Sequence, residues 1–229
     1  MKMMEKLLKH KKLVLIAISI VVCVSFIIVL FVILANKSYN VKFYSDNKEL
    51  LKIDTVKSGE SANPPVEPEL SYGSIFQKWD TDFSAVTKDL EVNPEFETIS
   101  GKENVFALTG AYGKKDDTAI TSLTLCGDVA LSGFDITVEY DKDELSLDSV
   151  FGNDESVIFN EKEPGKINLN YVSTENTTAD VDICSFKFKI TGTQETIPLT
   201  IKVNKVYANK GNDLISPRYT VLDSNVYVY

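Results

Sequence analysis

The side chains that most often carry out catalysis are scarce in this sequence. The only histidine is His10, which precedes a long apolar segment. A Ser–His or Cys–His nucleophile system therefore cannot form in the chain that follows this segment. Zinc sites built on His and Cys are excluded for the same reason. This composition predicts a protein that is not an enzyme.

Acidic residues are the remaining source of chemistry. The chain holds 33 Asp and Glu residues, so a carboxylate pair like that of a glycosidase stays open. A solvated acidic surface explains these residues more simply. Residues 141–148, DKDELSLD, have the acidic spacing of a calcium loop but lack its central Gly and the Glu at its twelfth position. We interpret them as a turn and expect neither a metal nor another cofactor in this chain.

Side chains that could bind a partner stand on two segments with strand periodicity. Residues 133–140 alternate apolar and polar side chains, which predicts a strand with one buried face and one wet face. The wet face carries Asp135, Thr137 and Glu139. A second strand is predicted at 166–172. Its core residues are Ile167, Leu169 and Tyr171, and its outward residues are Asn168, Asn170 and Val172, with Ser173 at the strand end.

Both segments belong to a long β-rich region. From about residue 103 onward, short β runs recur near every ten residues between turn signals, and no segment has helical periodicity. This pattern predicts a β-sandwich. Strand parity places one of Cys126 and Cys184 outside the sandwich and the other inside it. We therefore expect two thiols rather than a disulfide.

An apolar segment lies ahead of these regions. Residues 13–35 contain no charge, no Gly and no Pro. As a helix they would be roughly 34 Å long, enough to cross a bilayer core. Residues 1–12 hold five Lys and one Glu, which orients the N-terminus to the cytoplasm. The residues before Ala35 make a poor cleavage site, so we expect an uncleaved signal anchor with one transmembrane helix.

The net charge is unevenly distributed. The whole chain carries −9, while residues 1–12 carry +4, which leaves −13 for the remainder. An acidic body of this kind repels the phosphate backbone of nucleic acids. We therefore expect no nucleic-acid partner.

Residues 39–98 have the features of a small module. VKFYSDNKELLKIDTV predicts a hairpin, and SGESANPPVEPE predicts a loop. The stretch resembles the Listeria–Bacteroides repeat, an internalin B-type β-grasp-like unit of bacterial surface proteins. Val41, Phe43 and Tyr44, the loop VKSGESANPP and the run WDTDFSAVTKDLEV carry this resemblance. It implies an extracellular β module with a spacer or adhesive role, joined by the polar link ISGKEN (99–104) to the region that follows.

Four segments in series resemble a cohesin domain. They are GFDITVEYD with LSLDSV, then PGKINLNYVS, then the apolar run ICSFKFKI, and finally VYV. The resemblance covers about 125 residues and implies a jelly-roll sandwich of about nine strands over 103–229. Cohesins bind dockerin modules of polysaccharide-degrading enzymes or scaffold proteins. The calcium of such a complex belongs to the dockerin.

The cohesin resemblance also implies a binding face. In cohesins the strand that matches 133–139 lies on a flat sheet face that receives the dockerin helices, and Asp135 matches a polar contact there. Gly133 stands where some cohesins carry a further polar contact, and Leu214 matches an apolar contact. Asn170 and Ser173 replace apolar and acidic residues that cohesins often have, so this face is more polar. The implied partner-binding set is Asp135, Thr137, Asn168, Asn170, Val172, Ser173 and Leu214.

The sequence as a whole predicts a single-pass protein of a bacterial cell membrane whose C-terminal domains are extracellular. Its cohesin would tether a dockerin-bearing glycoside hydrolase or a scaffoldin to the cell surface. Two alternatives remain, a carbohydrate-binding module and a surface adhesin built on the same sandwich. A carbohydrate-binding module usually exposes a row of aromatic side chains, whereas the strand aromatics here have core parity. They are Tyr140, Tyr171, Phe186 and Phe188.

Overall fold

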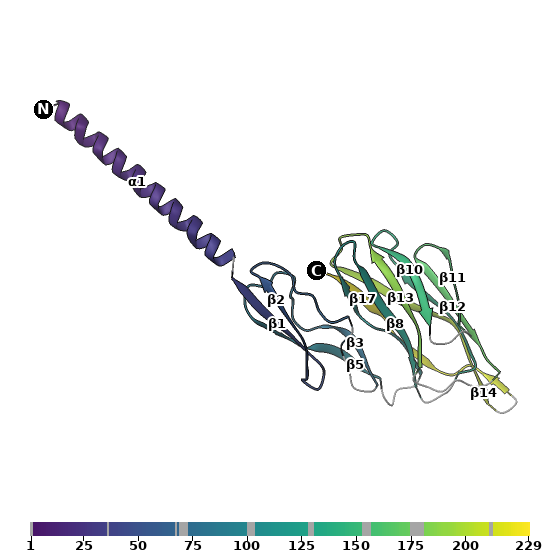
Figure 1. The fold of residues 1–229 in the computed structure, drawn as a ribbon. Helices are drawn as coiled ribbons and strands as arrows, with labels where there is room; N and C mark the ends of the chain where they lie inside the picture. Colours follow the sequence, from purple (N-terminus) through teal and green to yellow (C-terminus); the bar gives the residue numbers. More distant parts are fainter. Residues whose placement is uncertain are drawn as a thin grey trace.

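The computed structural model describes residues 2–35, 37–66, 68, 73–99, 104–127, 131–152, 157–174, 181–210 and 213–229. Its described elements are one long N-terminal helix, a small β module and a larger β-sandwich, which follow one another along the chain (Figure 1).

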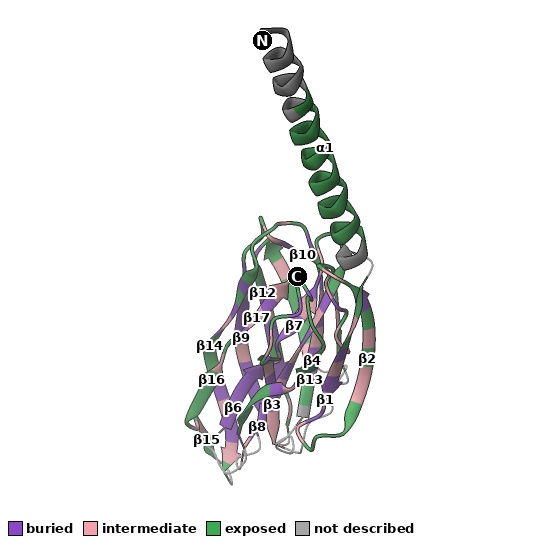
Figure 2. Ribbon diagram, turned by 90° about the vertical axis from the view of Figure 1, so that its left-hand side faces the viewer, coloured by how far each residue is buried: buried purple, intermediate pink, exposed green. Residues whose placement is uncertain are grey.

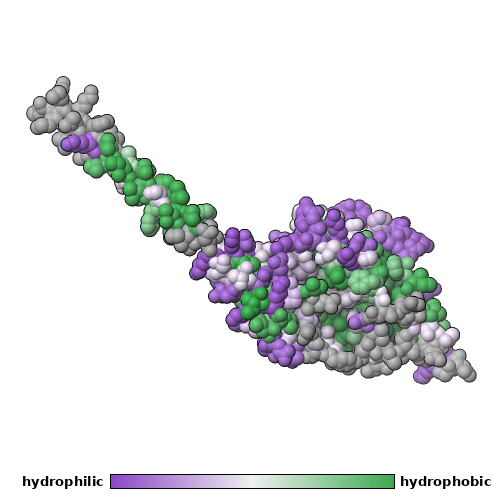
Figure 3. Space-filling view, in the orientation of Figure 1, coloured by the Kyte–Doolittle hydropathy of each residue, from purple (hydrophilic) through white to green (hydrophobic). Residues whose placement is uncertain are grey.

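Helix α1 (Lys2–Ala35) projects away from the β-rich part of the molecule (Figure 2). Its stretch from Val14 to Val32 has a mean hydropathy of 3.3, and none of that stretch is buried. Figure 3 shows hydrophobic side chains along the middle part of this helix. It is the one helix among the described residues that is long and apolar enough to cross a membrane, and its position near the N-terminus also suits a signal sequence.

The small module contains two short sheets. The predicted hairpin is confirmed: β1 (Ser38–Tyr44) pairs antiparallel with β2 (Leu50–Lys57), and β4 (Leu90–Val92) adds to β1 in parallel. Strands β3 (Ser74–Trp79) and β5 (Pro94–Thr98) form a separate antiparallel pair. Trp79 lies in the core of this module, where its ring meets the edges of Phe43 and Phe76.

The larger domain is a sandwich of a five-stranded and a seven-stranded sheet. The first sheet has the order β10 (Leu145–Gly152), β13 (Val181–Ile190), β8 (Thr118–Cys126), β6 (Asn104–Leu108) and β16 (Tyr219–Leu222). The second has the order β11 (Val157–Glu163), β12 (Lys166–Val172), β9 (Gly133–Tyr140), β14 (Thr196–Lys210), β17 (Ser224–Val228) and β7 (Ala111–Gly113), and β15 (Asp213–Ile215) pairs with β14.

Two runs of chain pass from one sheet to the other. Strands β6 and β7 are separated by residues 109–110, and β16 and β17 by residue 223. Strand β16 pairs in parallel with β6 in the first sheet, and β17 pairs in parallel with β7 in the second. If each run is taken as one strand and the three-residue β15 is left aside, the described part of the sandwich has nine strands, in agreement with the prediction.

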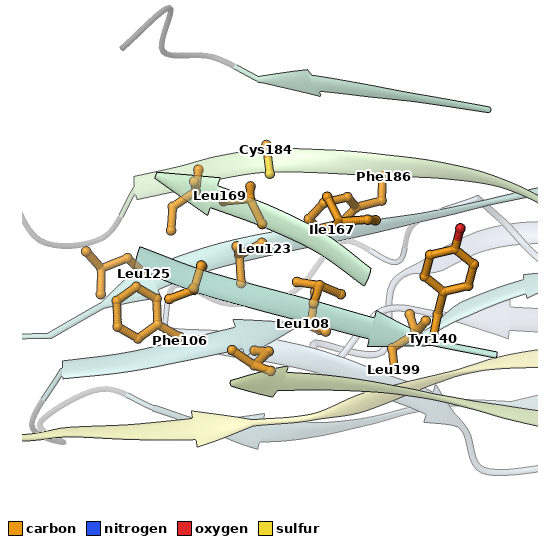
Figure 4. Packing of buried hydrophobic residues seen from close by; sticks show 14 of the residues in the cluster. Phe106, Leu108, Leu123, Leu125, Tyr140, Ile167, Leu169, Cys184, Phe186 and Leu199 are labelled. Carbon is orange, nitrogen blue, oxygen red and sulfur yellow. The ribbon is translucent and has the colours of Figure 1, made fainter. Parts of the chain in front are cut away.

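The core lies between these two sheets (Figure 4). Aromatic and aliphatic side chains from both sheets fill it, among them Phe106, Leu123, Ile167, Leu169 and Phe186. These residues alternate along their strands with outward-facing ones, which is why a period of two was readable in the sequence. Fully burying one such side chain contributes about 1.5–3 kcal/mol, so a core of this size supports an independent sandwich.

The module and the sandwich share buried surface. Ile75 and Ile99 of the module pack with Val105, Ala107 and Cys126 of the sandwich. The prediction of a polar link at 99–104 was therefore wrong at Ile99, which is 2% exposed, because an apolar partner across the boundary covers it. Residues 100–103 of that link lie outside the described part of the chain.

Both cysteines outside α1 are buried thiols and form no disulfide. The parity prediction is confirmed, because Cys184 lies in the sandwich core while Cys126 points to the outer side of its sheet. Cys126 is nevertheless 6% exposed, since the module covers it. Burial raises the pKa of the Cys184 thiol to about 12.

Candidate functional site

The predicted binding residues gather on the outer side of the seven-stranded sheet. We define the β9–β12 face as the outward side chains of β11, β12, β9 and β14 together with the adjacent strand β15. Its members are Asp135, Thr137, Glu139, Ile158, Asn160, Asn168, Asn170, Val172, Lys202, Asn204, Lys205 and Leu214.

The strand registers align this face in rows. One row runs from Ile158 through Asn170 and Asp135 to Lys205. The next row runs from Asn160 through Asn168 and Thr137 to Lys202. Side chains directly opposite each other on neighbouring strands have Cβ atoms about 4.5–5.5 Å apart. Four separate stretches of sequence therefore form one continuous surface.

A hydrogen-bonded network occupies the centre of the face. The Thr137 hydroxyl donates to Asn168 Oδ1 at 2.9 Å. Asn204 Nδ2 donates to Asp135 Oδ1 at 3.0 Å and to Thr137 Oγ1 at 3.2 Å. Asp135 Oδ2 accepts no hydrogen bond from the described residues. The network holds the Asp135 carboxylate in place while leaving one oxygen available to a donor from outside.

Large apolar side chains near this network are exposed to solvent. Val172 is 82% exposed, Ile158 69% and Leu214 61%. Ile158 lies directly opposite Asn170 on β12. Leu214 pairs with Asn209, which lies further along β14 than the face residues of that strand. Single exposed apolar residues are ordinary, but several of them on one face of a sheet can mark a protein-binding surface.

Charges lie along the β14 side of the face. Lys202 forms an ion pair with Glu139 at 2.6 Å. Lys205 is exposed and lies opposite Asp135 in the register. A β-bulge between Val203 and Lys205 shifts the alternation at this point and brings the Asn204 side chain onto the same side.

The structure brings five of the seven predicted residues together: Asp135, Thr137, Asn168, Asn170 and Val172. Leu214 lies on the same side by register, beyond the end of β9. Ser173 is at the rim, where its backbone N–H donates to the Ser132 carbonyl at 2.7 Å. These placements confirm which side of the sheet each strand presents, while the role of each residue in partner binding stays a prediction.

Asn204 and Ile158 are two of the face residues that the sequence prediction missed. Asn204 sits at a bulge, where simple alternation fails. Ile158 lies on β11, an edge strand that alternates weakly, and its position follows from its pairing with β12. Only the pairing of strands reveals either residue.

Gly133 has a packing reason of its own. A Cβ at this position would stand 3.0 Å from the Tyr171 carbonyl oxygen, closer than most real contacts. The strand therefore favours glycine here, whether or not cohesins place a polar contact at the matching position. Gly133 lies opposite Val172 on one neighbouring strand and opposite Tyr207 on the other.

The described residues offer little catalytic chemistry. They contain no group of three or more His, Cys, Asp or Glu that could hold a metal ion. The Tyr140 hydroxyl donates a hydrogen bond to Glu161, and burial, followed by this bond, raises the pKa of Tyr140 to about 12. The strand aromatics Tyr140, Tyr171, Phe186 and Phe188 are all buried, which confirms their core parity.

Comparisons with known proteins bear on the fold. No protein-family profile matches the chain, and no curated protein does. Solved structures do match. The seventh ScaB type I cohesin from Pseudobacteroides cellulosolvens is 14% identical, with 56% of this chain and 92% of that chain covered and a TM-score of 0.51. The fold is cohesin-like.

A second match is a chain of the complex between CaDoc0917 and CaCohA2. It is 17% identical, with 55% of this chain and 99% of that chain covered and a TM-score of 0.50. CaCohA2 from Clostridium acetobutylicum, in its solution structure, is likewise 17% identical, with a TM-score of 0.48. The matches with TM-scores of 0.50 and 0.51 cover 99% and 92% of their own chains and about half of this chain.

Proposed function

We propose that the cohesin-like domain binds a dockerin module through the β9–β12 face. The observation that carries this proposal is the ordered network of Asp135, Thr137, Asn168 and Asn204, surrounded by exposed apolar side chains, on a sheet of cohesin-like fold. The sequence segments that resemble cohesins include β9 and β12, two of the strands that build this face. Binding rather than catalysis agrees with the scarcity of catalytic groups.

The proposed contact is a helical surface laid against a flat sheet. A stable interface of this kind buries about 1,600 Å² in total, and a few central residues dominate its energy. We assign the central positions to Asp135, Asn170, Val172 and Leu214. The Asp135 carboxylate accepts a hydrogen bond from a donor group of the partner. Val172 and Leu214 lose their contact with water and pack against apolar side chains of the partner. No metal is needed on this chain, and calcium belongs to the dockerin.

The proposal also gives α1 a role. Its apolar stretch is long enough to span a bilayer, and the Lys-rich residues before it favour the cytoplasmic side. As an uncleaved anchor it would keep the β-rich part at the outer surface of a bacterial membrane. The bound dockerin would then hold a polysaccharide-degrading enzyme or a scaffoldin at the cell.

A binding titration tests this function. The whole chain in detergent micelles is immobilised, and purified dockerin modules encoded in the same genome are passed over it with calcium. We expect at least one dockerin to bind with a dissociation constant well below micromolar, and binding to disappear when a chelator removes calcium. If none of these dockerins binds, the function is wrong and the adhesin alternative gains support.

A further inference from the structure

Part of the outer surface of the sandwich is apolar and is covered by the preceding module. Along β6, Phe106 and Leu108 point into the sandwich core, whereas Val105 and Ala107 point away from it. On a sandwich that stood alone, Val105, Ala107 and the neighbouring Cys126 would face water. They are instead buried against Ile75 and Ile99 of the preceding module. This apolar surface packs against the module in the way that the two sides of a protein core pack against each other.

Aromatic side chains continue the same contact at β7. The Tyr112 hydroxyl oxygen accepts a hydrogen bond from the backbone N–H of Trp79 at 2.9 Å. The Tyr112 ring lies 5.7 Å from that of Phe83, and Tyr229 also meets Phe83, with ring centroids 5.3 Å apart. Burial raises the pKa of Tyr112 above its ordinary value. One sandwich side chain thus packs against the module core and accepts a hydrogen bond from the module backbone.

The two backbones approach most closely at Gly110. Its N–H donates to the Phe76 carbonyl at 2.8 Å. A Cβ on Gly110 would stand 1.8 Å from the Gln77 carbonyl oxygen, so no other residue fits there without moving the module. Glycine in a strand connection often marks such a close approach of another backbone.

We propose that residues 37–99 and the sandwich form one rigid body in solution. In this body the module permanently covers the outer side of β6 and β8 and holds the β9–β12 face at a fixed direction from β1. The module is then a rigid arm and not a flexible spacer. This inference does not depend on which partner the β9–β12 face binds.

Cys126 reports on this docking because it lies in the buried cluster to which Ile75 and Ile99 of the module contribute. The experiment uses the whole chain in detergent micelles with Cys23→Ser and measures thiol modification by an aromatic disulfide reagent. A docked module protects Cys126, and we expect it to react about 100-fold more slowly than an exposed thiol, equivalent to about 2.8 kcal/mol for opening. Cys184, buried inside the sandwich, stays unreactive as long as the sandwich is folded.

Two variants make the test specific. Gly110→Val pushes the module away, and we expect it to speed modification of Cys126 at least about tenfold. Tyr112→Phe removes the acceptor of the Trp79 N–H, and we expect a several-fold increase. The matched control is Tyr227→Phe: Tyr227 stacks on Tyr112, and its hydroxyl accepts a hydrogen bond from Asn225 within its own strand, so Cys126 reactivity should not change.

Each outcome decides the proposal. If Cys126 in the parent chain reacts as fast as an exposed thiol, the modules move independently and the proposal is overturned. If Gly110→Val also makes Cys184 reactive, that variant has unfolded the sandwich and Tyr112→Phe decides. An unchanged Cys126 rate in Tyr112→Phe then contradicts the proposal, and a raised rate with Cys184 still protected supports it.

Discussion

Replacing Asp135 by alanine probes the β9–β12 face most sharply. Its carboxylate is half-exposed and accepts one hydrogen bond within the described chain, from Asn204 at 3.0 Å. Losing a hydrogen bond of this kind costs the fold about 1 kcal/mol. Truncating a central interface residue weakens the free energy of binding by about 2 kcal/mol or more, which raises the dissociation constant about 30-fold. Asp135→Ala should therefore weaken binding far more than it weakens the fold.

The matched control for Asp135→Ala is Asp148→Ala. Asp148 is an exposed carboxylate on β10 of the other sheet and forms an ion pair with Lys187 at 2.9 Å. Exposed pairs contribute little to stability, and this residue lies away from the face. The assay is calorimetric titration of both variants with the bound dockerin, beside urea unfolding. Equal losses of affinity in both variants, or none in Asp135→Ala, would refute the placement of the interface.

Three further predictions follow from the same structure. Val172→Asp should raise the dissociation constant at least about 30-fold, because the interface would bury a charge that has no partner. Val66 is a similarly exposed residue of the module, and Val66→Asp should leave the dissociation constant unchanged. Calorimetric titration compares the two variants. Burial raises the pKa of Tyr140 and Tyr229 to about 12 from 10.0, so stability is full below pH 10 and falls as pH rises toward 12; a constant urea midpoint between pH 9 and 12 would contradict this. Chelation of calcium should abolish dockerin binding and leave the thermal unfolding of this chain unchanged, as scanning calorimetry can show.

Strand faces were predictable from the sequence because alternation reports them directly. The pattern over 133–140 placed Phe134 inside and Asp135 outside, and the pattern over 166–172 did the same for Ile167 and Asn170. A period of two survives wherever a strand is regular and half-buried. The sandwich fold and the side chains that β9 and β12 present on the β9–β12 face followed from this signal.

Features that depend on tertiary contacts were not predictable in this way. Asn204 joins the network because a bulge shifts β14, and a bulge has no clear signature in a single sequence. Cys126 and Ile99 are buried by contacts between two modules, which local patterns do not record. The domain boundaries at 39–98 and 103–229 stay predictions, and the shared buried surface explains why composition alone marks them poorly.

Photocrosslinking from the β9–β12 face tests the central claim most directly. Val172, which is on this face and 82% exposed, is replaced by benzoylphenylalanine in one chain, and Lys187 on the opposite sheet is replaced in another. Each chain is irradiated with a dockerin from the same genome in calcium. The account predicts a covalent adduct from position 172 that disappears with chelator, and none from position 187. An adduct only from position 187, or equal adducts from both, would contradict it.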